Sequence, residues 1–154
     1  KGFVDASGGG LNHVKLHGVI YSMSGRDRTL ARAVCDAIEP FGLALIGLPD
    51  TQLEAEAAAR GIPFLPEFFV DLPVDDDGRL VVAKDKPLDL GWVAERLRHA
   101  LRKGEVISTG GKPFPIRFAS IGVHLDMPNA ADVARVVASV LSEEGLRDLP
   151  GSRG

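Results

Sequence analysis

The chain has 154 residues, of which 45% are hydrophobic and 25% charged, ordinary values for a globular domain with a core. The formal net charge is -3, so no basic excess favours a nucleic acid or an anionic membrane as a partner. No apolar run approaches the roughly 18 residues of a membrane span, and no signal peptide is visible, so we expect a cytoplasmic protein. The single cysteine, Cys35, excludes an internal disulfide and is expected to be a buried packing residue.

The chain opens without a methionine, and its first residues look like the end of an element. Phe3 to Ala6 is typical of the last turn of a helix that ends at the glycine run Gly8 to Gly10. We therefore expect the sequence to begin inside an element and to be part of a longer chain. A strand is predicted over 11–17, followed by a loop over 21–25.

Alternating helices and strands are predicted over the next part of the chain. Asp27 is expected to cap a helix that runs to about Pro40, and a continuous apolar strand follows at 43–48. Thr51 to Glu54 forms a capping-box pattern for a helix that stops at Gly61. The next strand is expected at 64–70.

The second half begins with a turn at 75–78, followed by a short hairpin arm at 80–82. An amphipathic helix is predicted over 90–103, with Val93, Leu97, Ala100 and Leu101 facing inward. Basic residues are expected on solvated helix faces. These are Arg26, Arg28, Arg96, Arg98, Arg102 and Lys103.

The last elements complete an alternating pattern. A hairpin is expected around 110–113 with its second arm at 115–118, then a strand at 119–124, and a final helix capped by Asn129 that ends at Gly145. This order predicts an α/β fold with parallel strands. Four or five main strands are too few for a closed barrel, so the pattern fits part of a barrel as well as a small open sheet. The residues after 146 are expected to form a loose tail, 147–154.

Three residues near the start could form one side of a polar pocket. His13, Lys15 and His17 stand at i, i+2 and i+4, which places them on one face of a strand. Imidazoles can act as general acids, bases or metal ligands, and the lysine can hold an anion such as a carboxylate. A solvent-facing edge strand is the alternative. No familiar zinc spacing supports a metal here.

Two further groups of polar residues stand in later strands or directly after them. Glu67 stands in the apolar run 64–70 and needs a partner, for which Lys15 or a histidine is the expectation. Asp71 follows the same strand. Tyr21 can donate a hydrogen bond to a substrate or simply pack.

His124 and Asp126 follow the last predicted strand, where they can form an orienting pair or stand alone at the strand end and the next helix start. Because carboxyl ends of parallel strands carry the chemistry of α/β folds, we expect these groups to share one pocket. The chain has no P-loop and no GxGxxG motif, so it shows no ATP site of its own.

Three runs in order resemble the LamB/YcsF family, the family of the 5-oxoprolinase A subunits. HVKLHGVIYS at 13–22 is similar to the family's HVKPHGALYN-like run. Glu67 to Asp71, with DGRL at 77–80, is similar to an EVFADRxYxxDGxL-like run. IGVHLDMPNA at 121–130 is similar to an ICVHGDxPGA-like run. Their order and spacing agree up to about Gly145.

The resemblance implies a β/α barrel related to polysaccharide deacetylases, with residues 1–146 as the carboxyl-terminal portion of an incomplete barrel. Family members carry further motifs at the amino end that are absent here. The resemblance also implies ATP-dependent opening of 5-oxo-L-proline to L-glutamate together with subunits B and C, with ATP bound with or by these partners. A divalent metal and a homo-oligomer are left open.

The resemblance also assigns roles to site residues. Catalytic roles fall to His17, His124, Glu67 and Asp126, and substrate binding falls to His13, Lys15, Tyr21 and Asp71. Lys15 is expected to bind the substrate carboxylate, and His17 or His124 to transfer a proton.

Seven positions depart from the family pattern and leave the substrate open. They are Leu16, Ser22, Leu72, Val74, Ala83, Leu125 and Asn129. Two alternatives therefore stand beside the oxoprolinase interpretation: a metal-dependent deacetylase-like hydrolase that works alone, and a non-catalytic subunit that binds a small molecule.

Overall fold

The computed structural model describes residues 2–82 and 86–146, and the chain divides into two compact units. The first unit holds residues 1–68 and 118–120, and the second holds 69–117 and 121–154. The predicted loose tail, 147–154, lies outside the described residues, and so does Ala83, one of the positions that depart from the family pattern.

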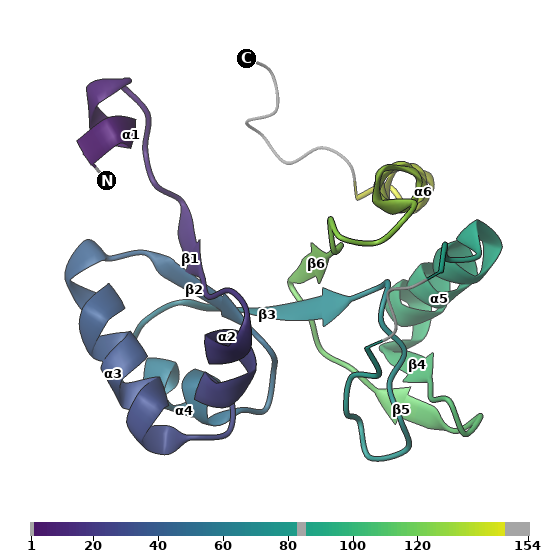
Figure 1. The fold of residues 1–154 in the computed structure, drawn as a ribbon, viewed down its shortest axis with the longest axis horizontal. Coiled ribbons are helices and arrows are strands. Elements are labelled where there is room, and N and C mark those ends of the chain that lie inside the picture. Colours follow the sequence, from purple (N-terminus) through teal and green to yellow (C-terminus); the bar gives the residue numbers. More distant parts are fainter. Residues whose placement is uncertain (1, 83–85, 147–154) are drawn as a thin grey trace. The chain divides into compact units, whose positions relative to one another are not determined.

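A four-stranded sheet with parallel pairing confirms the predicted mixed α/β class (Figure 1). Its strand order is β1-β2-β3-β6. The strands are β1 (His13–Lys15), β2 (Ala44–Gly47), β3 (Phe64–Phe69) and β6 (Ser120–Gly122). All four are shorter than predicted, and β1 and β6 end before the histidines that were assigned to their ends. Next to β6, the amide of Ala119 donates to the carbonyl of Pro66 on β3 at 2.8 Å.

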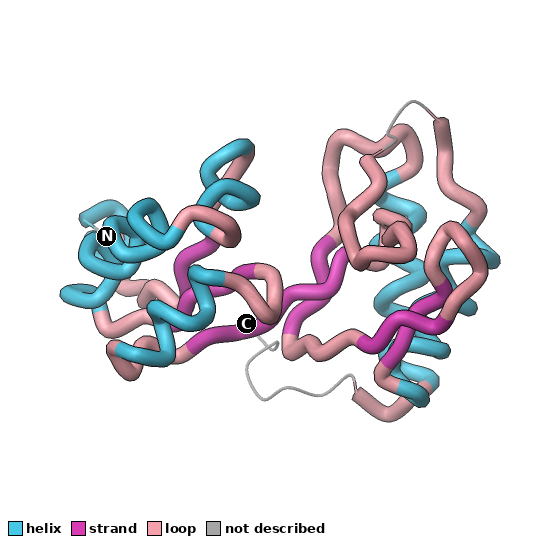
Figure 2. The backbone as a smooth tube through the Cα atoms, turned by 90° about the horizontal axis from the view of Figure 1, so that it is seen from below, coloured by secondary structure: helices cyan, strands magenta, loops and turns pink. Residues whose placement is uncertain are grey.

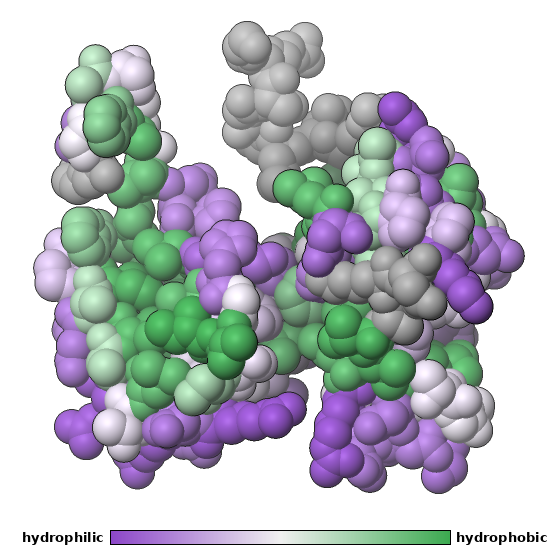
Figure 3. All heavy atoms as spheres, viewed as in Figure 1, coloured by the Kyte–Doolittle hydropathy of each residue, from purple (hydrophilic) through white to green (hydrophobic). Residues whose placement is uncertain are grey.

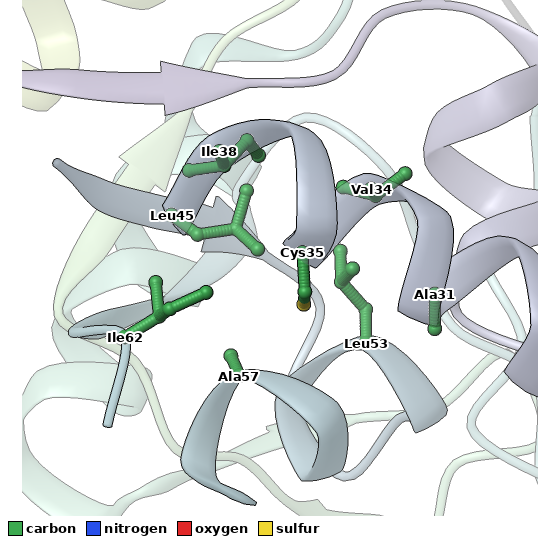
Figure 4. Packing of buried hydrophobic residues seen from close by; sticks show 8 residues of the cluster. All are labelled: Ala31, Val34, Cys35, Ile38, Leu45, Leu53, Ala57 and Ile62. Atoms are coloured by element: carbon green, nitrogen blue, oxygen red, sulfur yellow. The ribbon is translucent and has the colours of Figure 1, made fainter. Parts of the chain in front are cut away.

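One face of this sheet is apolar and carries the core of the first unit. Val14, Leu45 and Phe64 are register partners on β1, β2 and β3, so their side chains share a face. Helices α3 (Arg28–Ile38) and α4 (Gln52–Ala59) pack over Leu45 with buried side chains, Cys35 among them (Figure 4). Cys35 has no exposed surface, which confirms the prediction of a buried packing residue. Burial raises the pKa of its thiol.

The ends of these helices follow the predicted signals. The Asp27 carboxylate accepts from the amide of Leu30 at 3.1 Å, and the Thr51 hydroxyl accepts from the amide of Glu54 at 3.4 Å. The Glu54 carboxylate reaches back to the amide of Asp50 at 2.8 Å. The chain leaves α3 through a short 3-10 turn, η1 (Glu39–Phe41), before β2 begins.

The loop predicted over 21–25 is wrong, because residues Val19–Ser24 form helix α2. Gly18 turns the chain with a φ of 62° directly before it, and no proline or glycine interrupts the helix itself. Three apolar side chains of α2, those of Val19, Ile20 and Met23, are exposed, and green spheres cover this helix in Figure 3. At the start of the chain, α1 (Gly2–Ala6) confirms the predicted helix end.

The second unit is built on two helices of 14 residues and a hairpin. Helix α5 (Leu90–Lys103) packs against α6 (Ala130–Glu143) and against β4 (Glu105–Ile107), which pairs antiparallel with β5 (Pro113–Pro115) (Figures 1 and 2). Buried Val93, Leu97 and Ala100 confirm the predicted inward face of α5. No helix within residues 2–82 and 86–146 is long and apolar enough to span a membrane.

The start of α6 corrects a prediction. Asn129 makes no side-chain cap; its amide side chain bonds to the backbone amide and carbonyl of Leu88, at 3.0 and 2.9 Å. These two bonds satisfy the backbone amide and carbonyl of Leu88, shortly before α5. The amides of Asp132 and Val133 at the start of α6 do not need a side-chain cap, because both donate to the carbonyl of Asn129.

A tight turn at 75–78 is confirmed, with Gly78 at a φ of 78°. The Asp75 carboxylate accepts from the amides of Asp77 and Arg79, and an isolated bridge joins Val74 to Leu80. The Asp76 carboxylate accepts from the hydroxyl of Ser108 and pairs with Lys112, which fixes the turn to the β4–β5 hairpin.

Candidate functional site

The polar face of the sheet in the first unit brings Lys15 and Glu67 together. Lys15 and Leu65 are both in register with Ile46 of β2, and Glu67 stands two residues beyond Leu65, so Lys15 and Glu67 share the face opposite the helical core. Their Nζ and Oε1 atoms are 2.5 Å apart. The Glu67 side chain is only 4% exposed, which confirms the prediction that this carboxylate has a cationic partner.

Tyr21 completes this group from helix α2. Its hydroxyl donates to Glu67 Oε2 at 2.8 Å, and the Lys15 ammonium lies 5.8 Å from the centre of its ring. Burial, together with the charge of Glu67 and the hydrogen bond to it, raises the pKa of Tyr21 above its ordinary value. The phenol is therefore a hydrogen-bond donor at neutral pH and is not a base.

The two early histidines are placed at the surface of the first unit. His13 is exposed on β1 and its Nδ1 lies 3.3 Å from Oδ1 of Asn12, while His17 is exposed in the segment between β1 and α2. Because β1 ends at Lys15, the strand places His13 and Lys15 on one face but not His17. Their catalytic and binding roles stay predictions.

In the second unit, a buried carboxylate holds a histidine. Asp71 has no exposed surface, and one of its oxygens accepts from the amide of His124 at 2.5 Å. Both oxygens lie 3.1 Å from His124 Nδ1. The ring of Phe69 packs on the imidazole with centroids 4.7 Å apart. A carboxylate at Nδ1 favours the tautomer with the proton on that atom, so Nε2 is the nitrogen that can exchange a proton.

The carboxylate partner of His124 is thus Asp71, four residues after Glu67 in the sequence. Asp126 is exposed and precedes α6, which agrees with the alternative that placed it near a helix start. The group of Lys15, Glu67 and Tyr21 belongs to the first compact unit, and the pair of Asp71 and His124 belongs to the second. The prediction that these groups share one pocket therefore stays a prediction.

Arg96 is a residue of this region that sequence reasoning missed. It was expected on a solvated helix face, but it is 7% exposed and its Nη2 donates to the carbonyl of Leu72 at 2.8 Å. Its guanidinium lies 5.3 Å from the ring centre of Trp92. Burial lowers the pKa of Arg96 to about 10, and the charge of Asp71 acts in the opposite direction. The signal was in the sequence, because position 96 follows Val93 by three residues on the inward face of α5.

The positions that depart from the family pattern fall in different environments. Leu72 and Val74 are buried, at 2% and 6% exposed, so they belong to the apolar core of the second unit. Leu125 is 91% exposed. The first two substitutions therefore add to the core beside Asp71.

Neither a metal site nor a phosphate loop is formed by the part of the chain that the structure describes. Within it, no group of three or more His, Cys, Asp and Glu side chains could hold a metal ion. The glycine run Gly8 to Gly10 leads from α1 into β1, the reverse of the strand–loop–helix order of phosphate-binding loops.

Comparisons with known proteins agree with the three sequence runs. A family model described as the LamB/YcsF family matches residues 1–153. The lactam utilization protein lamB of Emericella nidulans is 38% identical over 148 residues, which are 93% of this chain and 58% of that protein. The 5-oxoprolinase A subunit of Nitrobacter winogradskyi is 32% identical over 146 residues, 91% of this chain and 57% of the relative.

A solved structure is similar over the same extent. The crystal structure of a lactam utilization protein from Thermus thermophilus matches with a TM-score of 0.83 and 33% identity, covering 94% of this chain and 59% of the other. The chain thus spans less than two thirds of the length of the relatives it matches.

Proposed function

The chain belongs to the LamB/YcsF family, and on this basis we propose that the protein takes part, as the A subunit of a 5-oxoprolinase, in opening the cyclic amide of 5-oxo-L-proline to L-glutamate. The relatives named as 5-oxoprolinase A subunits and as a lactam utilization protein support this substrate class. In this proposal the complete protein is a β/α barrel of the polysaccharide-deacetylase type, and residues 1–146 are its carboxyl-terminal portion.

The observation that carries the proposal is the pair of Asp71 and His124. Opening a lactam requires a base for the attacking water and an acid for the leaving nitrogen, and a histidine held by a buried carboxylate can do both in turn. His124 Nε2 takes a proton from water while the water oxygen bonds to the lactam carbonyl carbon. The same nitrogen returns that proton to the ring nitrogen as the carbon–nitrogen bond breaks, which yields the free amino group of glutamate.

The Lys15, Glu67 and Tyr21 group is proposed to bind. The ion pair with Glu67 orients the Lys15 ammonium, and Tyr21 holds the carboxylate from the other side. Lys15 then presents a fixed positive charge to the substrate carboxylate. The roles of His13, His17 and Asp126 stay predictions, and the proton-transfer role is assigned to His124 because His17 is exposed beyond the end of β1.

The amide of an unactivated lactam is stable, so the proposal includes ATP, which would supply activation of the amide oxygen. The described part of the chain lacks a phosphate-binding loop, so the proposal assigns nucleotide binding to partner subunits B and C. No metal step is included, because the described side chains do not form a ligand set of three.

The test is an assay of the complete gene product for glutamate release from 5-oxo-L-proline with ATP, with and without the two partner subunits. We expect glutamate only in the complex, and a loss of at least about a hundredfold in kcat for His124→Asn. His99→Asn is the matched control, since His99 pairs with Glu105 and its loss leaves kcat unchanged. No glutamate from a verified complex would reject the proposal, and metal-dependent hydrolysis without partners would support the deacetylase-like alternative.

A further inference from the structure

Arg96, a buried residue on helix α5, contacts the segment that carries Asp71. Asp71 is fully buried, and an isolated carboxylate there would carry a large desolvation cost. Arg96 of α5 belongs to the same compact unit and is itself 7% exposed. Its guanidinium donates to the carbonyl of Leu72, the residue directly after Asp71.

This bond acts on the position of Asp71. The Leu72 carbonyl belongs to the residue directly after Asp71, so a donor fixed on a 14-residue helix limits how that segment can turn. The Asp71 oxygens in turn set the imidazole of His124 through Nδ1, at 3.1 Å. The chain of contacts therefore runs from α5 through the segment after β3 to the ring of His124.

Charge acts in the same direction. Arg98, two residues along and so on the opposite side of α5, is engaged elsewhere: it pairs with Glu95 at 3.5 Å and with Glu143 at 2.7 Å. The charge of Asp71 is the one that acts favourably on the Arg96 guanidinium. A carboxylate accepts hydrogen bonds only, so Asp71 keeps the proton on His124 Nδ1.

From these contacts we propose that Arg96 is a positioning residue of the Asp71–His124 pair, which holds the segment after Asp71 and supplies its countercharge so that the imidazole keeps one tautomer and one orientation. Arg96 does not touch the reacting atoms. This inference rests on the proposed function only where it concerns turnover, because the effect of Arg96 on the imidazole of His124 does not depend on a substrate.

The experiment is nitrogen-15 NMR of the complete gene product with labelled histidine, in which His124→Asn assigns the signal of His124. We expect a slowly exchanging Nδ1 proton in the parent protein. In Arg96→Met this proton exchanges with water at least about tenfold faster, and Arg96→Lys, which keeps the charge but not the planar guanidinium, restores only part of the protection. Arg98→Met is the matched control on the same helix, and it leaves the exchange unchanged because Arg98 pairs with Glu143.

Activity separates this inference from the proposed function. In the assembled complex, Arg96→Met should lower kcat by up to about a hundredfold with KM nearly unchanged, as a misplaced catalytic group does. Unchanged Nδ1 exchange in Arg96→Met overturns the inference, whatever the activity is. Faster exchange in a protein without oxoprolinase activity supports the inference and rejects the proposed function.

Arg96→Met could fail to fold, because it removes a buried guanidinium. In that case Arg96→Gln, which keeps a donor for the Leu72 carbonyl but no charge, is the second variant. Faster exchange in the folded Gln variant supports the role of the charge, and exchange equal to that of the parent overturns the countercharge role of Arg96.

Discussion

Removing Lys15 should destabilise the first unit through a carboxylate that the fold keeps buried. Lys15→Met deletes the ammonium 2.5 Å from Glu67 Oε1, and the Glu67 side chain is 4% exposed. The carboxylate then retains the Tyr21 hydroxyl at 2.8 Å but loses its countercharge. Met preserves the length and the apolar stem of the lysine, so the perturbation is mainly electrostatic.

The expected magnitude lies between two limits. Exposed ion pairs contribute about 0.2–1 kcal/mol, and breaking a fully buried pair costs about 3–5 kcal/mol. The Lys15 side chain is 28% exposed, so water already screens one partner, and we expect Lys15→Met to lower the free energy of unfolding by about 2 kcal/mol. Glu67→Gln should cost about 1 kcal/mol, because an amide oxygen still accepts from Tyr21 and the ammonium can turn to water.

A double-mutant cycle measures the pair itself. If Lys15 matters mainly because Glu67 is charged, the double variant costs about 1.5 kcal/mol, which is less than the sum of about 3 kcal/mol for the single variants. Urea unfolding followed by circular dichroism gives the four free energies. Additivity within about 0.5 kcal/mol would refute the reasoning. The exposed pair of Arg98 and Glu143 is the control and should show a much smaller coupling.

Two further predictions test neighbouring features. Because its pKa is raised, the Tyr21 phenol stays protonated in the folded state while the unfolded chain ionises near pH 10; its stabilisation is complete below that pH and falls by about 1.4 kcal/mol per pH unit above it. The phenolate absorbance difference between the parent and Tyr21→Phe checks this, and ionisation of the folded protein near pH 10 would contradict it. Gly78→Ala should cost about 3 kcal/mol of unfolding free energy, since its Cβ would clash with the ring of Phe114 at a φ of 78°. Gly111→Ala, with a φ of 81° and open space, should cost about 1 kcal/mol in urea unfolding, and equal losses would show that the clash is relieved.

The sequence predicted what depends on local chemistry. A carboxylate in an apolar strand needs a partner, and Lys15, one of the partners expected for Glu67, is the residue that pairs with it. The cap of Asp27 and the bounds of the helix at 90–103 followed from residues within one turn of each helix end.

What the sequence did not reveal depends on tertiary partners. Residues 21–25 carry loop-like serines and a glycine, but the turn at Gly18 and the bond from Tyr21 to Glu67 stabilise a six-residue helix that would be marginal alone. Arg96 looks like a surface residue unless its carbonyl acceptor at Leu72 is known. Asn129 fits a cap by type, but Leu88, 41 residues away in the chain, takes its side chain.

The register of the sheet has a consequence for the order of folding. β1 pairs with β2 through His13 and Ala44, which closes the crossover that holds α2, α3 and η1, and β2 pairs with β3 through Leu45 and Phe64, which closes the crossover that holds α4. The bond from Ala119 to Pro66 closes a much longer loop. Because loop closure costs entropy before contacts repay it, β1 to β3 can assemble before β6 has been synthesised. Until β6 has been synthesised, the edge of β3 that pairs with β6 in the folded sheet stays unpaired.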